Sequence, residues 1–169
     1  MSLPRRYGTE DVIFGPKYSF VAIGKNSFNI KLLKDVTYKL AVDASVFEQQ
    51  GCNSPHTVFV ENGGDVSPVE FAVALAEAMK RVLKRIPKNS VSADEASTIV
   101  NVRAEYSFMG RVFSSKGTEW TVIFSEDKGL AKAFYSRIIF VRPVDDINEI
   151  LEYIEPNKHQ TLGLCINIE

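Results

Sequence analysis

The chain has 169 residues, 45% of them hydrophobic, and its 20 basic and 21 acidic residues leave a net charge of −1. This length can bury roughly two thirds of the unfolded surface, so one domain is expected, and the balanced charge argues against a nucleic-acid partner. The apolar runs are too short for a membrane segment or secretion signal, and two cysteines with two histidines are too few for a disulfide framework or a zinc site. We therefore expect a cytoplasmic protein with reduced thiols, no metal and no membrane contact.

The first predicted elements are a strand, a helix and a second strand. Residues 18–23 are rich in aromatic and β-branched side chains, which predicts a strand. Apolar residues then recur every three or four positions, which predicts a helix that ends near Glu48. The apolar face of this helix consists of Leu33, Val36, Leu40, Ala44 and Phe47. Residues 57–61 predict the second strand, and the glycine-rich residues 62–65 predict a turn.

A well-marked helix follows this turn. Ser67 and Glu70 form a capping-box pattern, and Pro68 occupies the favoured first helical position. The helix must end by Ile86, because a proline follows. Its buried face is predicted to consist of Phe71, Ala72, Leu75, Met79, Val82 and Leu83.

Another helix comes directly after it, before the next predicted strand. Ser92 and Glu95 repeat the capping pattern, and Gly110 is expected to end the helix. Residues 120–124 and 137–141 have the composition of strands. Two successive helices therefore separate the second predicted strand from the third.

The chain closes with a short helix and a last strand. Asp145 or Asp146 is expected to cap the helix, which explains this pair better than a catalytic dyad does. Residues 162–168 predict the strand, and residues 138–141 and 164–166 have the composition of strands buried on both sides. Strands that alternate with helices predict an α/β fold with a mostly parallel sheet and helices on both faces.

Cys52 is the candidate nucleophile, because it lies in a small polar loop between the first predicted helix and the second strand. A thiol that titrates near about 8.5 needs nearby amides, a cation or a helix terminus to react as a thiolate at neutral pH. Gly51 lets the backbone come close, and Asn53 and Ser54 can donate hydrogen bonds. The backbone N–H of Cys52 is a natural oxyanion donor. These four residues are the predicted catalytic loop.

Other candidate residues have simpler interpretations. Cys165 is flanked by apolar residues and is expected to pack in the core. His56 and His159 are isolated, so structural or surface roles are expected. No Lys-Ser or Lys-Thr pair follows Gly63-Gly64, which predicts a turn and no phosphate cradle.

Two further functions remain open from the residues alone. One is a non-catalytic α/β interaction or oligomerisation domain, in which Cys52 is a buried thiol. The other is a cysteine hydrolase or acyltransferase without redox chemistry, which needs a histidine and an acidic or amide side chain beside Cys52.

Several stretches of the sequence resemble one family of enzymes. The first begins at Phe47-Glu48 and leads into Val58-Phe59-Val60-Glu61. Its most specific part is Gln49-Gln50-Gly51-Cys52-Asn53-Ser54-Pro55. Further matches in the same order are Phe14-Gly15-Pro16-Lys17, Trp120-Thr121-Val122-Ile123, Ser136-Arg137-Ile138-Ile139 with Val144-Asp145-Asp146, and Gln160-Thr161-Leu162-Gly163. Together they resemble the acyl-CoA reductase (LuxC-type) branch of the aldehyde dehydrogenase superfamily over nearly the whole chain.

This resemblance implies an aldehyde dehydrogenase-like catalytic domain. It implies that Cys52 accepts a long-chain acyl group from a CoA or protein thioester, and that NADPH reduces the acyl-cysteine to an aldehyde. It also implies acyl-transferring partner subunits and a homo-oligomer for the full-length protein.

The sequence departs from complete family members because it has no glycine-rich strand-to-helix turn for a nucleotide. Cofactor-binding residues therefore cannot be assigned, and the second oxyanion donor and the general base are expected outside the chain. We expect residues 1–169 to be a single catalytic domain excised from a longer chain, without its nucleotide-binding domain. On this interpretation the fragment alone is inactive as a reductase.

Overall fold

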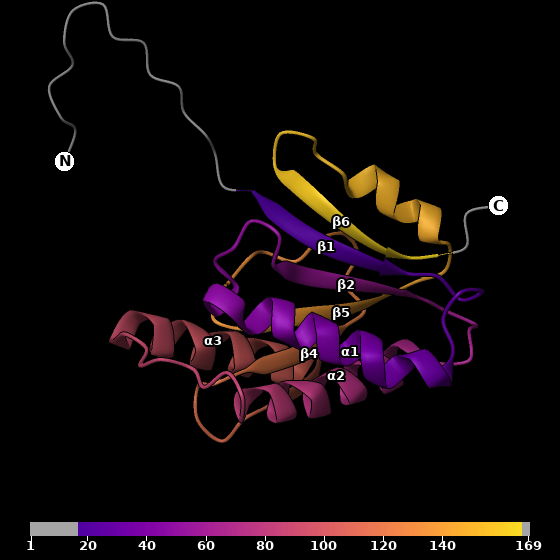
Figure 1. The fold of residues 1–169 in the computed structure, drawn as a ribbon. Helices are drawn as coiled ribbons and strands as arrows, with labels where there is room; N and C mark the ends of the chain where they lie inside the picture. Colours follow the sequence, from indigo (N-terminus) through magenta and orange to yellow (C-terminus); the bar gives the residue numbers. More distant parts are fainter. Residues whose placement is uncertain (1–16, 167–169) are drawn as a thin grey trace, which may run out of the picture.

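The computed structural model describes residues 17–166, in which a six-stranded sheet has helices against both faces (Figure 1). The strands lie in the order β3-β4-β5-β2-β1-β6. β3 and β4 are antiparallel, and the other neighbouring strands are parallel. The predicted α/β fold with a mostly parallel sheet is therefore confirmed. Phe14-Gly15-Pro16 of the family resemblance lies outside the described residues.

The elements follow one another in an order that alternates strands and helices through most of the chain. They are β1 (Tyr18–Ile23), α1 (Ile30–Ser45), η1 (Val46–Gln49), β2 (Pro55–Glu61), α2 (Pro68–Leu83), α3 (Ala93–Met109), β3 (Gly110–Ser114), β4 (Thr121–Ser125), β5 (Ile138–Val144), η2 (Ile147–Tyr153) and β6 (His159–Cys165). η2 is a 3₁₀ helix, and η1 is a short turn labelled in the same way although its residues 47–49 have positive φ angles.

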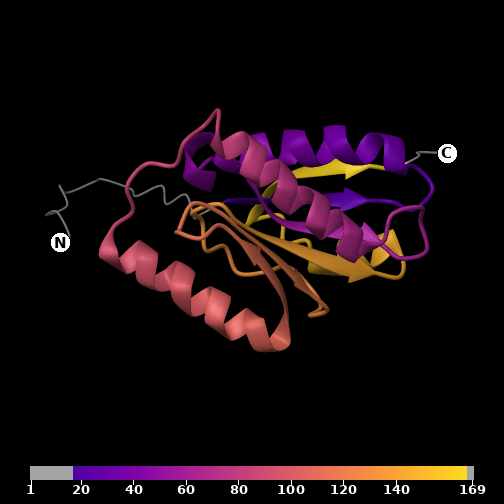
Figure 2. The ribbon, with the colours of Figure 1, turned by 90° about the horizontal axis from the view of Figure 1, so that it is seen from below.

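Helices α1 and α2 cover one face of the sheet, and α3 covers the other (Figure 2). Successive side chains of a strand point to opposite faces, so β2 contributes to both. Val58 and Val60 pack in the cluster beneath α1 and α2, whereas Phe59 packs with Ile150 of η2 on the opposite face. Two-sided burial explains why every residue of β2 is buried.

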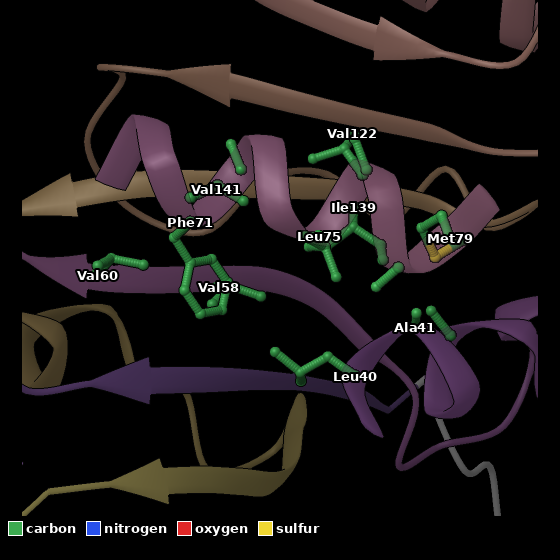
Figure 3. Packing of buried hydrophobic residues seen from close by; sticks show 14 of the residues in the cluster. Leu40, Ala41, Val58, Val60, Phe71, Leu75, Met79, Val122, Ile139 and Val141 are labelled. Carbon is green, nitrogen blue, oxygen red and sulfur yellow. The ribbon is translucent and has the colours of Figure 1, made fainter. Parts of the chain in front are cut away.

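The largest cluster of buried apolar residues lies between α1, α2 and the sheet (Figure 3). The predicted face of α2 is confirmed, and Ser67 and Glu70 form the predicted capping box at its start. From this face, Phe71, Leu75 and Met79 point to the strands. Burial of each such side chain contributes about 1.5–3 kcal/mol to folding.

Helix α1 ends earlier than its apolar pattern predicts. It starts after Asn29, whose side chain accepts N–H groups of the first turn, and it ends at Ser45. Phe47 and Glu48 have φ angles of 54°, which lie outside the helical region. The prediction that Phe47 belongs to the buried face is wrong, because the chain has left the helix there and the residue is 78% exposed.

Strand β3 was not predicted, and it makes residues 121–125 the fourth strand. Gly110 joins α3 directly to β3 in extended backbone, and its Cα lies so close to the Phe124 carbonyl that a Cβ would clash. A glycine that looks like a simple helix stop therefore also permits a close contact between strands.

The prediction that residues 164–166 are buried on both sides is wrong. β6 lies at an edge of the sheet and ends at Cys165, and Leu164 is 52% exposed. Cys165 itself packs against the large cluster beneath α1, as predicted, and burial raises the pKa of its thiol. Residues 138–141 are buried on both faces, as predicted.

We expect Leu75→Ala to destabilise the fold by about 2–5 kcal/mol, because it leaves a cavity in the large cluster. Val73→Ala on the same helix is the matched control, because Val73 is 45% exposed and its loss should change stability by at most about 0.5 kcal/mol. Urea unfolding followed by circular dichroism measures both values. Equal effects of the two substitutions would contradict the assignment of the buried face.

Candidate active site

Cys52 lies in a turn at the amino end of strand β2, and its side chain is exposed. The N–H of Ser54 donates to the carbonyl of Gly51 at 2.9 Å, which closes the turn. The hydroxyl of Ser19, in the neighbouring strand β1, donates to the carbonyl of Cys52 at 2.6 Å. The thiol is therefore accessible, while the backbone that carries it is fixed to the sheet.

The other predicted loop residues lie together in this turn. Ser54 is buried and its hydroxyl donates to the Asp43 carbonyl at 3.0 Å, so Ser54 anchors the turn to α1. A Cβ on Gly51 would lie 3.1 Å from Asn53 Oδ1 and 3.2 Å from Ser54 Oγ. Glycine at position 51 therefore lets both side chains pack against the backbone. Asn53 is exposed beside Cys52.

Gln49 fixes the two ends of the turn to each other, a role that was not predicted. Its side chain is fully buried, and Nε2 donates to the carbonyls of Pro55 at 2.7 Å and Ile138 at 2.9 Å. Its Oε1 accepts the N–H of Ile138 at 2.9 Å. The Gln49 side chain therefore connects the residue before the turn, Gln49 itself, to Pro55 after the turn and to Ile138 at the start of β5.

The buried Arg137 forms an ion pair with the partly exposed Glu48 next to Gln49, and this pair was not predicted either. Arg137 Nε and Nη2 donate to the two carboxylate oxygens of Glu48 at 2.8 and 2.7 Å. Arg137 Nη1 also donates to the Ile86 carbonyl at 2.8 Å, and Nη2 lies 3.3 Å from the Pro87 carbonyl. The arginine side chain is 1% exposed, so these acceptors replace water.

Lys88 is a second buried cation close to this pair. Its Nζ donates to the carbonyls of Thr118 at 3.0 Å and Ser136 at 3.1 Å, and lies 3.4 Å from Glu95 Oε1. Burial lowers the pKa of Lys88, and the nearby Glu95 carboxylate partly opposes that shift. The hydroxyl of Ser136 donates to the same carboxylate. Residues 136–137 are thus held by buried charges on both sides.

The sequence signal for these missed residues lay inside the family resemblance. Glu48 and Gln49 directly precede the cysteine turn, and Arg137 directly precedes an apolar strand. Arg137 is a charged residue next to a strand with the composition of a buried one, where an unpaired polar group is costly. Their mutual contact joins positions 89 residues apart and required the fold to be known.

His56 is buried between two tyrosine rings near the same end of the sheet. The ring centroids of Tyr18 and Tyr135 lie 5.8 and 5.3 Å from that of His56, both in edge-to-face geometry. Within the described residues its Nδ1 has no hydrogen-bond partner, and burial lowers the pKa of His56 to about 4. His56 is therefore neutral at physiological pH. It also lines a cavity of about 360 Å³, together with Lys132 and His159.

The opposite edge of the sheet has a different character. A cavity of about 470 Å³ lies where β2, β4 and β5 end, and Glu126, Asp127 and Asp145 are among its lining residues. Asp146 caps η2, as the sequence predicts. No group of histidine, cysteine or acidic side chains within residues 17–166 is arranged to hold a metal ion. No helix in this range is long and apolar enough to cross a membrane.

The connections after β1 and β2 do not form a cradle for a nicotinamide dinucleotide. Its diphosphate normally binds free N–H groups at a helix start after a glycine-rich turn. At the start of α2, the Glu70 carboxylate already accepts from Ser67. At the start of α1, the Asn29 side chain accepts main-chain N–H groups. Gly64 serves close packing, since a Cβ there would lie 3.1 Å from the Lys25 Cα.

Solved aldehyde dehydrogenases share this fold. The NAD-dependent aldehyde dehydrogenase from Burkholderia multivorans superposes with a TM-score of 0.61 at 17% identity, over 81% of this chain and 28% of that one. The 1-pyrroline-5-carboxylate dehydrogenase of Thermus thermophilus gives a TM-score of 0.59 at 13% identity, over 89% and 31% of the two chains. The domain is therefore aldehyde dehydrogenase-like in fold.

Within this fold class, the chain belongs to the acyl-CoA reductase (LuxC) family, whose model matches residues 1–169. It is 27% identical to the long-chain acyl-protein thioester reductase of Vibrio harveyi over 151 residues, and 29% identical to that of Aliivibrio fischeri over 152 residues. Each match covers 89% of this chain. The chain spans about 30% of the length of these relatives.

We expect acid to destabilise the protein partly through His56. Its pKa is near 6.5 when unfolded and about 4 when folded, so the unfolded state binds the proton more tightly. This contribution to stability is complete above about pH 6.5 and is lost as the pH falls toward 4. Between about pH 7.5 and 4.5, the loss of unfolding free energy should be about 2–3 kcal/mol larger in the wild type than in His56→Phe.

Urea unfolding at the two pH values measures this difference. The phenylalanine keeps an aromatic ring and removes no hydrogen bond of Nδ1. His159→Gln is the control and should change the difference less, because His159 is only partly buried. Identical acid sensitivity of wild type and His56→Phe would refute the prediction.

Proposed function

We propose that this chain carries the acyl-accepting step of a long-chain acyl-thioester reductase, with Cys52 as the nucleophile. The observation that supports this most directly is an exposed thiol on a turn whose backbone is hydrogen-bonded to β1, α1 and β5. An accessible nucleophile on a fixed backbone is what attack on a bound carbonyl requires. The names of the curated relatives as acyl-protein thioester reductases support the substrate class.

In the proposed step, the Cys52 thiolate attacks the carbonyl carbon of the acyl thioester. A new carbon–sulfur bond forms, the bond from the carbonyl to the donor sulfur breaks, and the released thiolate takes a proton from water. The backbone N–H of Cys52 is proposed to stabilise the developing oxyanion, with Asn53 as a nearby side-chain donor. Gly51 and Ser54 act as loop support.

We further propose that the acyl-cysteine is reduced to an aldehyde by hydride from NADPH. A nicotinamide cofactor agrees with the names of the relatives and with a fold shared with a dehydrogenase that has bound NAD. The described strand-to-helix connections do not fit the dinucleotide, so we propose that a domain outside this chain binds it. No part of the mechanism proposed for residues 17–166 depends on the cofactor.

The donor is proposed to be long-chain acyl-CoA or an acyl-protein thioester, delivered in the second case by an acyl-transferring partner subunit. A homo-oligomer is proposed for the full-length protein. A cytoplasmic location is also proposed, because a catalytic thiol has to stay reduced.

The two alternative functions gain no support from the geometry. A buried, inert thiol does not agree with the exposure of Cys52. A non-redox acyltransferase needs a histidine held by an acidic or amide side chain, whereas His56 Nδ1 has no hydrogen-bond partner within residues 17–166.

Intact-mass analysis tests the nucleophile. After incubation with tetradecanoyl-CoA, we expect one tetradecanoyl adduct on the wild-type chain and on Cys165→Ser, and none on Cys52→Ser. Treatment with neutral hydroxylamine should remove the adduct, because it cleaves thioesters. An unmodified wild type, or an adduct that persists in Cys52→Ser, would refute the proposal.

A second assay tests the division of labour between domains. The purified 169-residue chain, given tetradecanoyl-CoA and NADPH, should form no aldehyde beyond the background seen with Cys52→Ser. NADPH absorbance and trapping of the aldehyde with a hydrazine report the product. Steady aldehyde formation by the wild-type chain would show that the cofactor binds within it.

A further inference from the structure

We propose that Glu48, Gln49 and Arg137 are positioning residues that hold Cys52 in the geometry needed for acyl transfer. This inference rests on the function proposed above. We call the side chains of Glu48, Gln49 and Arg137 the junction cluster. Their hydrogen bonds go to one another and to the backbone, so their influence on Cys52 passes through the backbone of the turn.

The junction cluster joins two segments in an uncommon backbone conformation. Residues 47–49 have φ angles of 54°, 54° and 65°, and residues 135–137 have φ angles of 58°, 57° and 62°. Residues other than glycine rarely adopt this left-handed backbone conformation, and they keep it only where surrounding contacts hold them. The two segments meet directly, because the N–H of Ser136 donates to the Glu48 carbonyl at 3.2 Å.

Arg137 supplies the rigid part of this contact. Its planar guanidinium holds both oxygens of Glu48 in a fork and reaches two main-chain carbonyls with the remaining donors. Buried ion pairs often add little stability compared with apolar residues of similar size, so stability alone does not explain one here. A fork does fix direction, and lysine cannot reproduce it.

Gln49, the residue after Glu48, links this contact to the turn through hydrogen bonds of its side chain. Its carboxamide offers two donors to the carbonyls of Pro55 and Ile138 and one acceptor to the N–H of Ile138. This pattern matches an amide and not a carboxylate, which would face two carbonyls with oxygen. Residues 50–54 are therefore a short turn whose two ends are fixed by one side chain, with Cys52 in its middle.

Fixing the turn matters for acyl transfer more than for general thiol reactivity. Attack on a bound thioester requires a set distance and direction, and a displacement of about 1 Å can lower such a rate roughly 100-fold. A small soluble alkylating agent approaches an exposed thiol from many directions. The ratio of the two rates therefore reports positioning.

The experiment measures both rates for Cys52 in a Cys165→Ser background. Acylation by tetradecanoyl-CoA and alkylation by iodoacetamide are followed by intact mass. The test variants are Arg137→Lys, Gln49→Glu and Gln49→Met, of which the last is neutral and similar in length if Gln49→Glu fails to fold. The matched control is Arg142→Lys in β5, the strand that Arg137 directly precedes, because Arg142 is also buried and also contacts a carboxylate and two carbonyls.

In the test variants we expect the acylation-to-alkylation ratio to fall roughly tenfold or more, and in Arg142→Lys to stay within about twofold of the wild-type ratio. Circular dichroism confirms that each variant is folded. An unchanged ratio in the folded Gln49→Met and Arg137→Lys variants, with a wild type that is acylated, overturns the role of the junction cluster alone. Absence of acylation in the wild type instead overturns the proposed function, and with it this inference.

Discussion

At the amino ends of the neighbouring strands β2 and β5, main-chain polar groups bind the side chain of Gln49. The carbonyl of Ile138, the first residue of β5, accepts from the Gln49 side chain, and the Ile138 N–H is shared between Gln49 Oε1 and the Tyr135 carbonyl. The preceding residue, Arg137, places its guanidinium in the interior, where its partners among residues 17–166 are Glu48 and main-chain carbonyls. An unpaired amide or charge at this depth is costly. Residues 47–49 and 135–137 adopt the left-handed conformation that brings these partners together. The Cys52 turn directly follows the first of these segments.

The direction of the strands decides which chemistry lies at which edge. β1, β2 and β5 run parallel, so their amino ends gather the Cys52 turn, the buried His56 and the segment around Arg137. Their carboxyl ends meet an acidic cavity and the capped start of η2. Ligands of parallel α/β sheets commonly bind at the carboxyl ends of the strands. In this domain the accessible thiol lies at the amino ends of the strands, so the proposed acyl donor would approach from that side.

Local patterns in the sequence predicted most of the scaffold. The capping box at Ser67 and the apolar face of α2 were assigned correctly, since both depend on residues within a few turns of one helix. The apolar pattern failed at Phe47, because spacing along a chain does not reveal where the backbone leaves the helix. The edge position of β6 was missed for a related reason, because strand order is a property of the whole sheet. Cys52 was proposed as the nucleophile from its polar surroundings, and the structure adds that it is exposed. The contact between Gln49 and Ile138 spans too long a stretch of sequence for any local pattern to reveal it.

Residues 86–88, which follow helix α2, show how buried cations can replace regular secondary structure. Arg137 binds the carbonyls of Ile86 and Pro87, and the ammonium group of Lys88 is surrounded by carbonyls and a carboxylate from three other parts of the chain. The segment is neither helix nor strand, yet two of its carbonyls accept hydrogen bonds from the buried Arg137 guanidinium. The start of the connection from α2 to α3 is therefore held in place by these hydrogen bonds. Lys88 also pairs with Glu95 of α3, so the position of that helix depends on the same charges that surround the start of β5.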